Sequence, residues 1–281
     1  MSPHWVKNDI VVDGVKIHYT RTGDGSQPPL VLAHGFSDNG LCWLPVARDL
    51  EAEYDVILPD ARGHGFSARV QPGETIDMVA DLAGLIRGLG LNQPILGGHS
   101  MGAYTSSQVE ARFPGLVRAL VLEDPPWREP EPPTAPEPQS TGLKEGQLRA
   151  NPMADRILSL EKSSVDELVV NCRKDNPKWP EVELRPWAES KKQFDYNFLQ
   201  RPGGLPGDWQ DVFQAIRCPT LLITGDPAKG AIVTPETAQK VHAMNSKIQV
   251  VTITGAGHSI RRENYPDYIH AVRAFLKEQS L

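Results

Sequence analysis

The chain has 281 residues, of which 40% are hydrophobic and 23% charged, with a formal net charge of −6 at pH 7. This length and composition are typical of one large globular domain, or of a core domain with a sizeable insertion. The acidic balance argues against a protein that binds nucleic acid or an anionic membrane surface.

An antiparallel hairpin is predicted at the start of the chain, where residues 10–12 and 15–19 flank Asp13-Gly14. Short apolar runs follow, and such runs are typical of parallel strands buried on both faces. They lie at residues 30–33, 56–58, 95–96, 116–122, 221–224 and 249–253. Between most of them are helix-length segments, notably residues 76–89, 101–112, 235–244 and 266–277. This alternation predicts a doubly wound α/β sheet.

One stretch interrupts this pattern. Residues 125–138 contain seven prolines, which cannot hold a helix or a central strand because proline lacks an amide donor. Helical pieces are predicted beyond it, at residues 155–161, 165–174 and 186–198. We expect residues 127–210 to form a cap over the carboxyl end of the sheet, and residues 1–126 and 211–281 to form the core. A partly mobile loop with no substrate role is the alternative for residues 128–142.

The strongest motif is Gly-His-Ser-Met-Gly at residues 98–102, placed between a predicted strand and a predicted helix. A serine at so sharp a turn is held in a strained conformation, and the flanking glycines, Gly98 and Gly102, avoid a collision there. The turn presents the hydroxyl at the edge of the sheet, beside a helix N-terminus that favours negative charge. Ser100 is therefore the predicted nucleophile.

A serine nucleophile needs a base within hydrogen-bond reach. His258 follows the last predicted strand on a glycine-rich loop, which places it at the same sheet edge as Ser100. His242 and His270 lie on predicted helices, whereas His64 and His99 lie in glycine-rich loops that suit orientation or pocket lining. We predict that His258 is the base.

An oxyanion hole requires two backbone amides that face the developing negative charge. One is expected from Met101, the residue after the nucleophile. The other is expected from Phe36, in the loop His34-Gly35-Phe36 after the strand at residues 30–33, where Gly35 lets the backbone approach closely.

Together these motifs and the segment Asp-Ala-Arg-Gly-His-Gly-Phe-Ser at residues 60–67 resemble the α/β-hydrolase superfamily in order and spacing. The resemblance covers residues 5–124 and 215–280. It implies an eight-stranded, mostly parallel sheet with helices on both faces, a helical cap after the sixth strand and a cofactor-free Ser-His-acid mechanism. It also implies that residues 60–67 form a structural loop beside the pocket.

The acid of the triad departs from the usual family pattern. An Asp is expected three residues beyond the glycine that follows the seventh strand, but Ala228 stands there and Asp226 comes only one residue after Gly225. The other family position, at the end of the sixth strand, holds Asp124. Both candidates have another reading, Asp124 as a turn cap before Pro125 and Asp226 as an Asx-turn residue. We favour Asp124.

These residues predict acyl transfer to water by a carboxylic ester hydrolase, acting on a small, moderately hydrophobic ester or lactone. Pocket walls are expected from His34, Gly35, His99, Trp127, Val233 and Ile260. Packing of the cap against the core is the other reading of Trp127. Hydrolysis of a carbon–carbon bond is one alternative, and it would want an arginine such as Arg149, Arg156, Arg173 or Arg185 over the pocket. A non-catalytic receptor for a small ligand is the alternative from another class.

The first nine residues do not resemble a signal peptide, and no apolar run is long enough to span a bilayer. Cys42, Cys172 and Cys218 are widely spaced, without the rhythm of metal ligands. We therefore expect a cytoplasmic protein with reduced thiols, no metal and no cofactor, existing as a monomer or small homo-oligomer.

Overall fold

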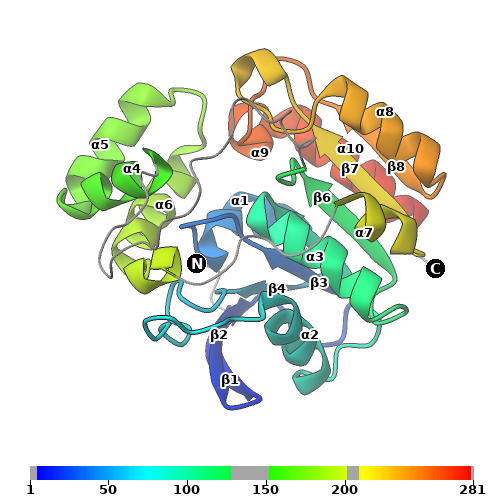
Figure 1. The fold of residues 1–281 in the computed structure, drawn as a ribbon, viewed down its shortest axis with the longest axis horizontal. Coiled ribbons are helices and arrows are strands. Elements are labelled where there is room, and N and C mark those ends of the chain that lie inside the picture. Colours follow the sequence, from blue (N-terminus) through cyan, green and yellow to red (C-terminus); the bar gives the residue numbers. More distant parts are fainter. Residues whose placement is uncertain (1–4, 128–151, 201–208, 280–281) are drawn as a thin grey trace, which may run out of the picture.

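An eight-stranded sheet forms the centre of the structure, a computed structural model that describes residues 5–127, 152–200 and 209–279 (Figure 1). The strand order is β1-β2-β4-β3-β5-β6-β7-β8. β1 and β2 pair antiparallel, as do β2 and β4, and the other pairs are parallel. The strands are β1 (Val6–Val12), β2 (Val15–Arg21), β3 (Pro29–Ala33), β4 (Asp55–Pro59), β5 (Ile95–His99), β6 (Ala119–Glu123), β7 (Thr220–Thr224) and β8 (Ile248–Thr252). The predicted sheet is confirmed.

Local sequence explains most strand positions. Asp13 and Gly14 have φ of 48° and 82°, and such positive values at both central residues are those that a tight two-residue hairpin turn requires. β4, β5, β6 and β7 are buried along their whole length, in keeping with strands covered on both faces. β6 begins later than the predicted run at residues 116–122, because the Leu116 amide donates to the Phe113 carbonyl in the turn after α3.

Helices cover both faces of the sheet. One core cluster includes side chains of α2, α3, α7 and α8, and a second includes side chains of α1, α9 and α10 on the other face. The helices of the core are α1 (Leu44–Leu50), α2 (Met78–Gly88), α3 (Met101–Arg112), α7 (Trp209–Ala215), α8 (Pro235–Met244), α9 (Ile260–Glu263) and α10 (Tyr265–Glu278), with short 3₁₀ helices η1 (Gly40–Trp43) and η3 (Pro227–Lys229).

Among the described residues between β6 and α7, three helices lie together at one side of the molecule (Figure 1). They are α4 (Pro152–Glu161), α5 (Val165–Asp175) and α6 (Glu181–Gln193), followed by the 3₁₀ helix η2 (Tyr196–Gln200). The helix predicted at residues 186–198 is wrong in its bounds. Glu181 and Glu183 occupy the first turn of α6, where the helix dipole favours acidic side chains, and Pro186 lies inside the helix.

The limits of the predicted cap stay a prediction. Most of the proline-rich stretch, residues 128–138, lies outside the described residues. α7 begins at Trp209, two residues before the predicted return to the core, and it already packs against α3 and α8.

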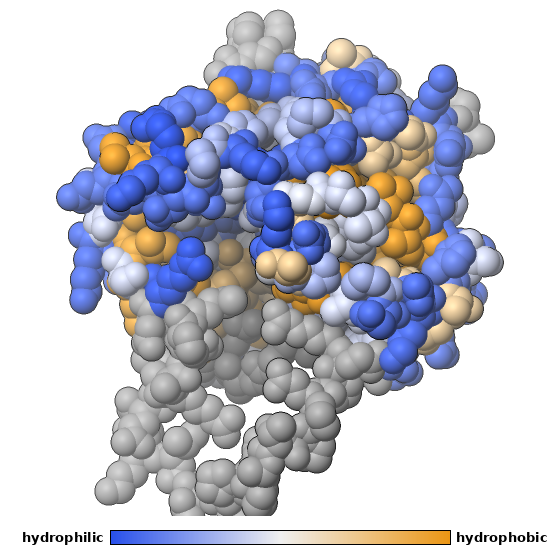
Figure 2. Space-filling model, turned by 90° about the horizontal axis from the view of Figure 1, so that it is seen from above, coloured by the Kyte–Doolittle hydropathy of each residue, from blue (hydrophilic) through white to orange (hydrophobic). Residues whose placement is uncertain are grey.

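Hydrophilic residues cover much of the described surface seen in Figure 2, with hydrophobic residues in separate patches. No helix in the described ranges combines the length and the apolar character needed to cross a membrane.

Candidate active site

Ser100 stands at the sharp turn between β5 and α3. Its backbone has φ of 51° and ψ of −115°, a conformation that is strained for any residue other than glycine. The neighbouring glycines make this turn possible. A Cβ added to Gly98 would lie 2.3 Å from the Gly102 carbonyl carbon, and one added to Gly102 would lie 2.2 Å from the Ala33 carbonyl oxygen. Ser100 is thereby held directly before the first turn of α3.

His258 and Asp124 form a hydrogen-bonded pair at the carboxyl ends of β8 and β6. Nδ1 of His258 is 2.6 Å from Oδ2 of Asp124, and the Asp124 side chain is fully buried. The amides of Ile232 and Val233 donate to the same carboxylate at 2.8 and 2.9 Å. A carboxylate fixed in this way holds a histidine with Nδ1 protonated and leaves its Nε2 free to accept a proton.

Contacts between β5, β6 and the His258 loop bring this pair to Ser100. The Ser100 amide donates to the Glu123 carbonyl at 2.9 Å, and Asp124 is the next residue. Nε2 of His99 is 3.0 Å from the His258 carbonyl oxygen, and the two rings are 4.7 Å apart. The structure has no hydrogen bond between the Ser100 hydroxyl and the His258 ring, a contact that in many enzymes tightens only when substrate binds.

Asp226, the other candidate acid, has different partners. Its carboxylate accepts from the Ala228 amide at 2.9 Å and caps η3, and its own amide donates to the Ala256 carbonyl at 2.7 Å. No hydrogen bond joins it to His258, although both residues are described. This is the Asx-turn arrangement, and it favours Asp124 as the acid.

The loop after β3 runs against the first turn of α3. A Cβ on Gly102 would lie 2.6 Å from the His34 carbonyl oxygen as well, so the two backbones are in close contact. Within the described parts of the chain, no acceptor binds the amide of Phe36 or of Met101. Two free amides beside a serine are what an oxyanion hole needs.

Three buried histidines, His34, His64 and His99, hold the loops around this turn. Nδ1 of His34 faces the Gly35 carbonyl, Nδ1 of His64 faces the Arg62 carbonyl and Nε2 of His99 faces the His258 carbonyl. Because a carbonyl only accepts, each of these nitrogens carries a proton. The second nitrogens of His34 and His64 accept from backbone amides. These contacts place the histidines as supports of the backbone.

The same three histidines predict a loss of stability in mild acid. Burial lowers the pKa of His34, His64 and His99 below the usual 6.5, for His64 and His99 well below it. Below about pH 6.5 the unfolded chain therefore binds protons that the folded chain does not, and the free energy of unfolding falls as the pH falls. The slope should be set mainly by His64 and His99, whose pKa values burial lowers furthest.

Urea unfolding at pH 7.5, 6.0 and 5.0 checks this expectation. His64→Gln should lower this slope, because a group that binds a proton only in the unfolded chain is gone. A free energy of unfolding that stays constant from pH 7.5 to 5.0 would contradict it.

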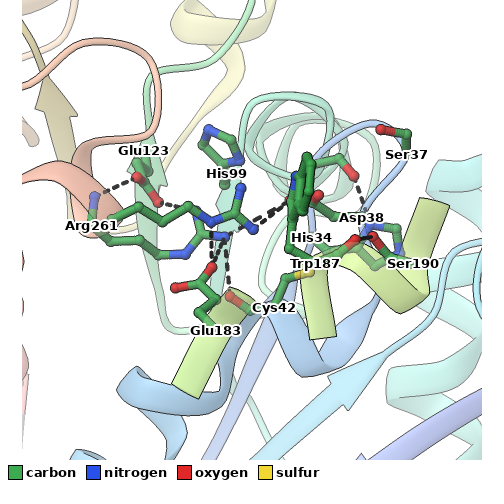
Figure 3. Close-up of polar contacts among 12 residues, drawn as sticks. His34, Ser37, Asp38, Cys42, His99, Glu123, Glu183, Trp187, Ser190 and Arg261 are labelled. Carbon is green, nitrogen blue, oxygen red and sulfur yellow. Dashed lines mark hydrogen bonds and ion pairs between the residues drawn. The ribbon is translucent and has the colours of Figure 1, made fainter. Parts of the chain in front are cut away.

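A buried ion-pair cluster lies beside the same loops (Figure 3). It contains three positive and three negative side chains, each at most 4% exposed: Arg261, Arg262, Lys191, Asp38, Glu123 and Glu183. Burial alone would raise the pKa of Asp38, but Arg262, Lys191 and Arg261 hold it well below its usual range. Sequence reasoning missed this cluster.

With this geometry in place, comparison with known proteins identifies the family. A model of the alpha/beta hydrolase family matches residues 30–271. The chain belongs to this family. The 2-(acetamidomethylene)succinate hydrolase of Mesorhizobium japonicum is 27% identical over 279 residues, which cover 98% of this chain and 96% of that enzyme. Epoxide hydrolase 3 of Mus musculus is 26% identical over 289 residues, which cover 94% of this chain and 75% of that enzyme.

A solved structure has the same fold. The crystal structure of E-2-(acetamidomethylene)succinate hydrolase matches with a TM-score of 0.76 and 22% identity, over 98% of this chain and 100% of that one. The family, the fold and a hydrolase activity class are therefore shared, whereas these relatives are named for quite different substrates.

Three residues that are predicted to line the pocket of this α/β-hydrolase belong to its core clusters. Trp127 and Val233 belong to one core cluster and Ile260 to the other, and none of the three side chains is exposed. Trp127 packs edge-on against Phe213 with ring centroids 4.0 Å apart, which is the packing alternative. Their enclosed side chains favour the packing alternative, and their place as pocket walls stays a prediction.

An apolar cluster packs around Met101, and its aromatic members after α6 were not predicted. Met101 packs with Phe194 and Phe198, which follow α6, and Phe36 packs against the same cluster. The rings of Phe36 and Phe194 are 5.2 Å apart. The alternating aromatic residues Phe194, Tyr196 and Phe198 are the sequence signal that could have indicated it.

The arginines that carbon–carbon bond hydrolysis would require do not gather at the turn that carries Ser100. Arg173 pairs with Glu181 and Arg185 with Asp166 on exposed parts of α5 and α6. Arg156 is exposed on α4, and Arg149 lies outside the described residues. Of these four, the three that the structure describes therefore give no support to that reaction.

Proposed function

We propose that this α/β-hydrolase is a serine hydrolase that cleaves a small, moderately hydrophobic carboxylic ester or lactone. The observation that carries the proposal is the strained Ser100 at the sheet edge where His258 is hydrogen-bonded to the buried Asp124. Serine at this turn favours acyl transfer over the opening of an epoxide, although an epoxide hydrolase is among the relatives.

The proposed reaction has two halves. The Ser100 oxygen attacks the ester carbonyl carbon while His258 Nε2 takes the hydroxyl proton, and the amides of Phe36 and Met101 bind the resulting oxyanion. His258 then passes that proton to the departing alkoxide, which leaves as an alcohol. Water attacks the acyl-enzyme in the same way and releases the acid. Asp124 stays ionised throughout and stabilises the imidazolium.

The substrate class follows from the surroundings of Ser100. Phe36, Met101 and Phe194 form an apolar cluster next to the proposed oxyanion hole, which suits a short hydrocarbon acyl or alcohol group.

A second candidate is hydrolysis of an acyl group bound to nitrogen. It is favoured by the relative that covers nearly the whole chain, because the substrate in that enzyme's name carries an acetamido group. The same serine, base and oxyanion hole serve both reactions, and the difference lies in whether His258 delivers its proton to an oxygen or to a nitrogen leaving group.

A graded substrate panel tests the proposal. The wild-type protein is expected to turn over p-nitrophenyl acetate and p-nitrophenyl butyrate with a higher kcat/KM than p-nitrophenyl palmitate, because the apolar cluster is small. N-acetyl and N-formyl enamides in the same panel test the second candidate. Binding of esters without turnover of any panel member would favour the receptor alternative and contradict the proposal.

A further inference from the structure

The backbone that follows Phe36 is held from the cap helix α6. Lys191 of α6 is 4% exposed, and its ammonium donates to the Ser37 carbonyl at 2.9 Å, to the Ser37 hydroxyl at 3.0 Å and to Asp38 Oδ1 at 2.8 Å. An ammonium has three N–H donors, so these three contacts use all of them. One cap residue thus fixes the two residues directly after the proposed oxyanion amide.

This segment of the loop needs such support. Ser37 has φ of 61°, in the left-handed region that disfavours a residue with a side chain. Its amide donates to Nε2 of His64 at 3.2 Å, and its carbonyl is bound by Lys191. Both sides of the strained residue are therefore tied to fixed partners, which restrains the preceding Phe36.

A second residue of α6 extends the attachment. Oε1 of Gln193 accepts from Asn39 Nδ2 at 2.8 Å, so the end of α6 binds three consecutive residues of the loop. Arg262 binds Asp38 from the other side, with its Nη2 donating to Asp38 Oδ2 at 2.9 Å. Arg262 lies four residues after His258, so this contact connects the loop to the segment that carries the base (the base loop).

Figure 3 shows how the remaining members of the cluster join the cap to the base loop. Arg261 lies between Glu123 and Glu183, and its amide and Nη1 both donate to Glu123, at 2.9 and 3.0 Å. Glu123 directly precedes Asp124, and Glu183 belongs to α6. Helix α6 is therefore bonded to the oxyanion loop and, through the arginine, to the segments that carry the acid and the base.

We infer that Lys191 is a positioning residue of the oxyanion hole: by binding Ser37 and Asp38 from the cap, it fixes the Phe36 amide for the reaction. The inference rests on the proposed serine hydrolase function. It implies that α6 stays bound to the core during turnover and forms part of the catalytic architecture.

A thiono-ester comparison measures the oxyanion hole directly. Sulfur is larger than oxygen and accepts hydrogen bonds less well, so a well-formed hole favours p-nitrophenyl butyrate over its thiono analogue. The ratio of the two kcat/KM values does not depend on how much of the protein is folded, because both rates scale with the same active concentration. A purely structural role for Lys191 would leave this ratio unchanged.

Lys191→Met is expected to lower kcat for the oxygen ester by about 10- to 100-fold and to lower the oxygen-to-sulfur ratio by about tenfold. The matched control is Lys192→Met on the same helix, whose side chain is exposed and binds the carbonyls of Glu161 and Ser163. It should match the wild-type protein in both quantities.

Two further variants guard against misfolding. Lys191→Met combined with Asp38→Asn restores equal numbers of positive and negative side chains in the buried cluster, and Lys191→Gln keeps two N–H donors. The ratio should fall in the first variant and be intermediate in the second. An unchanged ratio in every soluble Lys191 variant would overturn the inference while leaving the serine hydrolase proposal standing. Failure of the wild-type protein to turn over any substrate of the panel would overturn both.

Discussion

Ser100→Ala is expected to lower kcat by about 10⁴- to 10⁶-fold without loss of the fold, and His258→Ala should do the same. Removing the hydroxyl leaves no atom to form the acyl-enzyme, and removing the imidazole leaves nothing to take the hydroxyl proton. Steady-state kinetics with p-nitrophenyl butyrate checks both variants, alongside the melting temperature.

The chain offers matched controls for these two substitutions. Ser107 is also on α3 but donates to the Tyr104 carbonyl within the helix, and His270 is exposed on α10. Ser107→Ala and His270→Ala should keep near-normal kcat. Near-normal activity in Ser100→Ala or His258→Ala would show that the nucleophile or the base is another group.

Asp124→Asn should lower kcat by about 10⁴-fold, whereas Asp226→Asn should change it by less than about threefold. The side-chain oxygen of asparagine can still accept from the amides of Ile232 and Val233, so the fold is expected to survive. Asparagine carries no negative charge, however, and no longer holds His258 in the required tautomer. Asp226 only caps η3, and an amide at that position can keep this contact.

Measuring both variants in the same assay separates the two candidate acids. A large loss confined to Asp226→Asn would place the acid after the seventh strand and contradict the account. A large loss in both would mean that the loop at residues 225–230 moves toward His258 during the reaction.

Local patterns were sufficient for most of the fold. The Asp13-Gly14 hairpin, the buried parallel strands and the Gly98–Gly102 turn each depend on residues close together in sequence, and the structure has all of them. The short helices α1 and α9 were not predicted, because four to seven residues show too little periodicity for a pattern to emerge.

The neighbours of the site were harder to predict because they meet across long separations. Asp124 and His258 are 134 positions apart, and Lys191 and Ser37 are 154 apart. No spacing rule joins such residues, so only the family position favoured Asp124, and nothing in the sequence pointed to Lys191.

Sequence alone does not distinguish an apolar residue that lines a pocket from one that packs in the core. Val233 was expected to line the pocket, but its side chain packs in the core while its backbone amide holds Asp124. The hydropathy of a side chain carries no information about what its own amide binds, and this contact is visible only in three dimensions.

During turnover Ser100 should carry the acyl group of the substrate. Rapid acid quenching of wild-type protein during turnover of p-nitrophenyl butyrate, followed by peptide mass spectrometry, tests it most directly. We expect a butyryl adduct on the peptide containing Ser100, absent from Ser100→Ala and retained in Ser107→Ala. A butyryl adduct on any other residue, or the same adduct in Ser100→Ala, would contradict it.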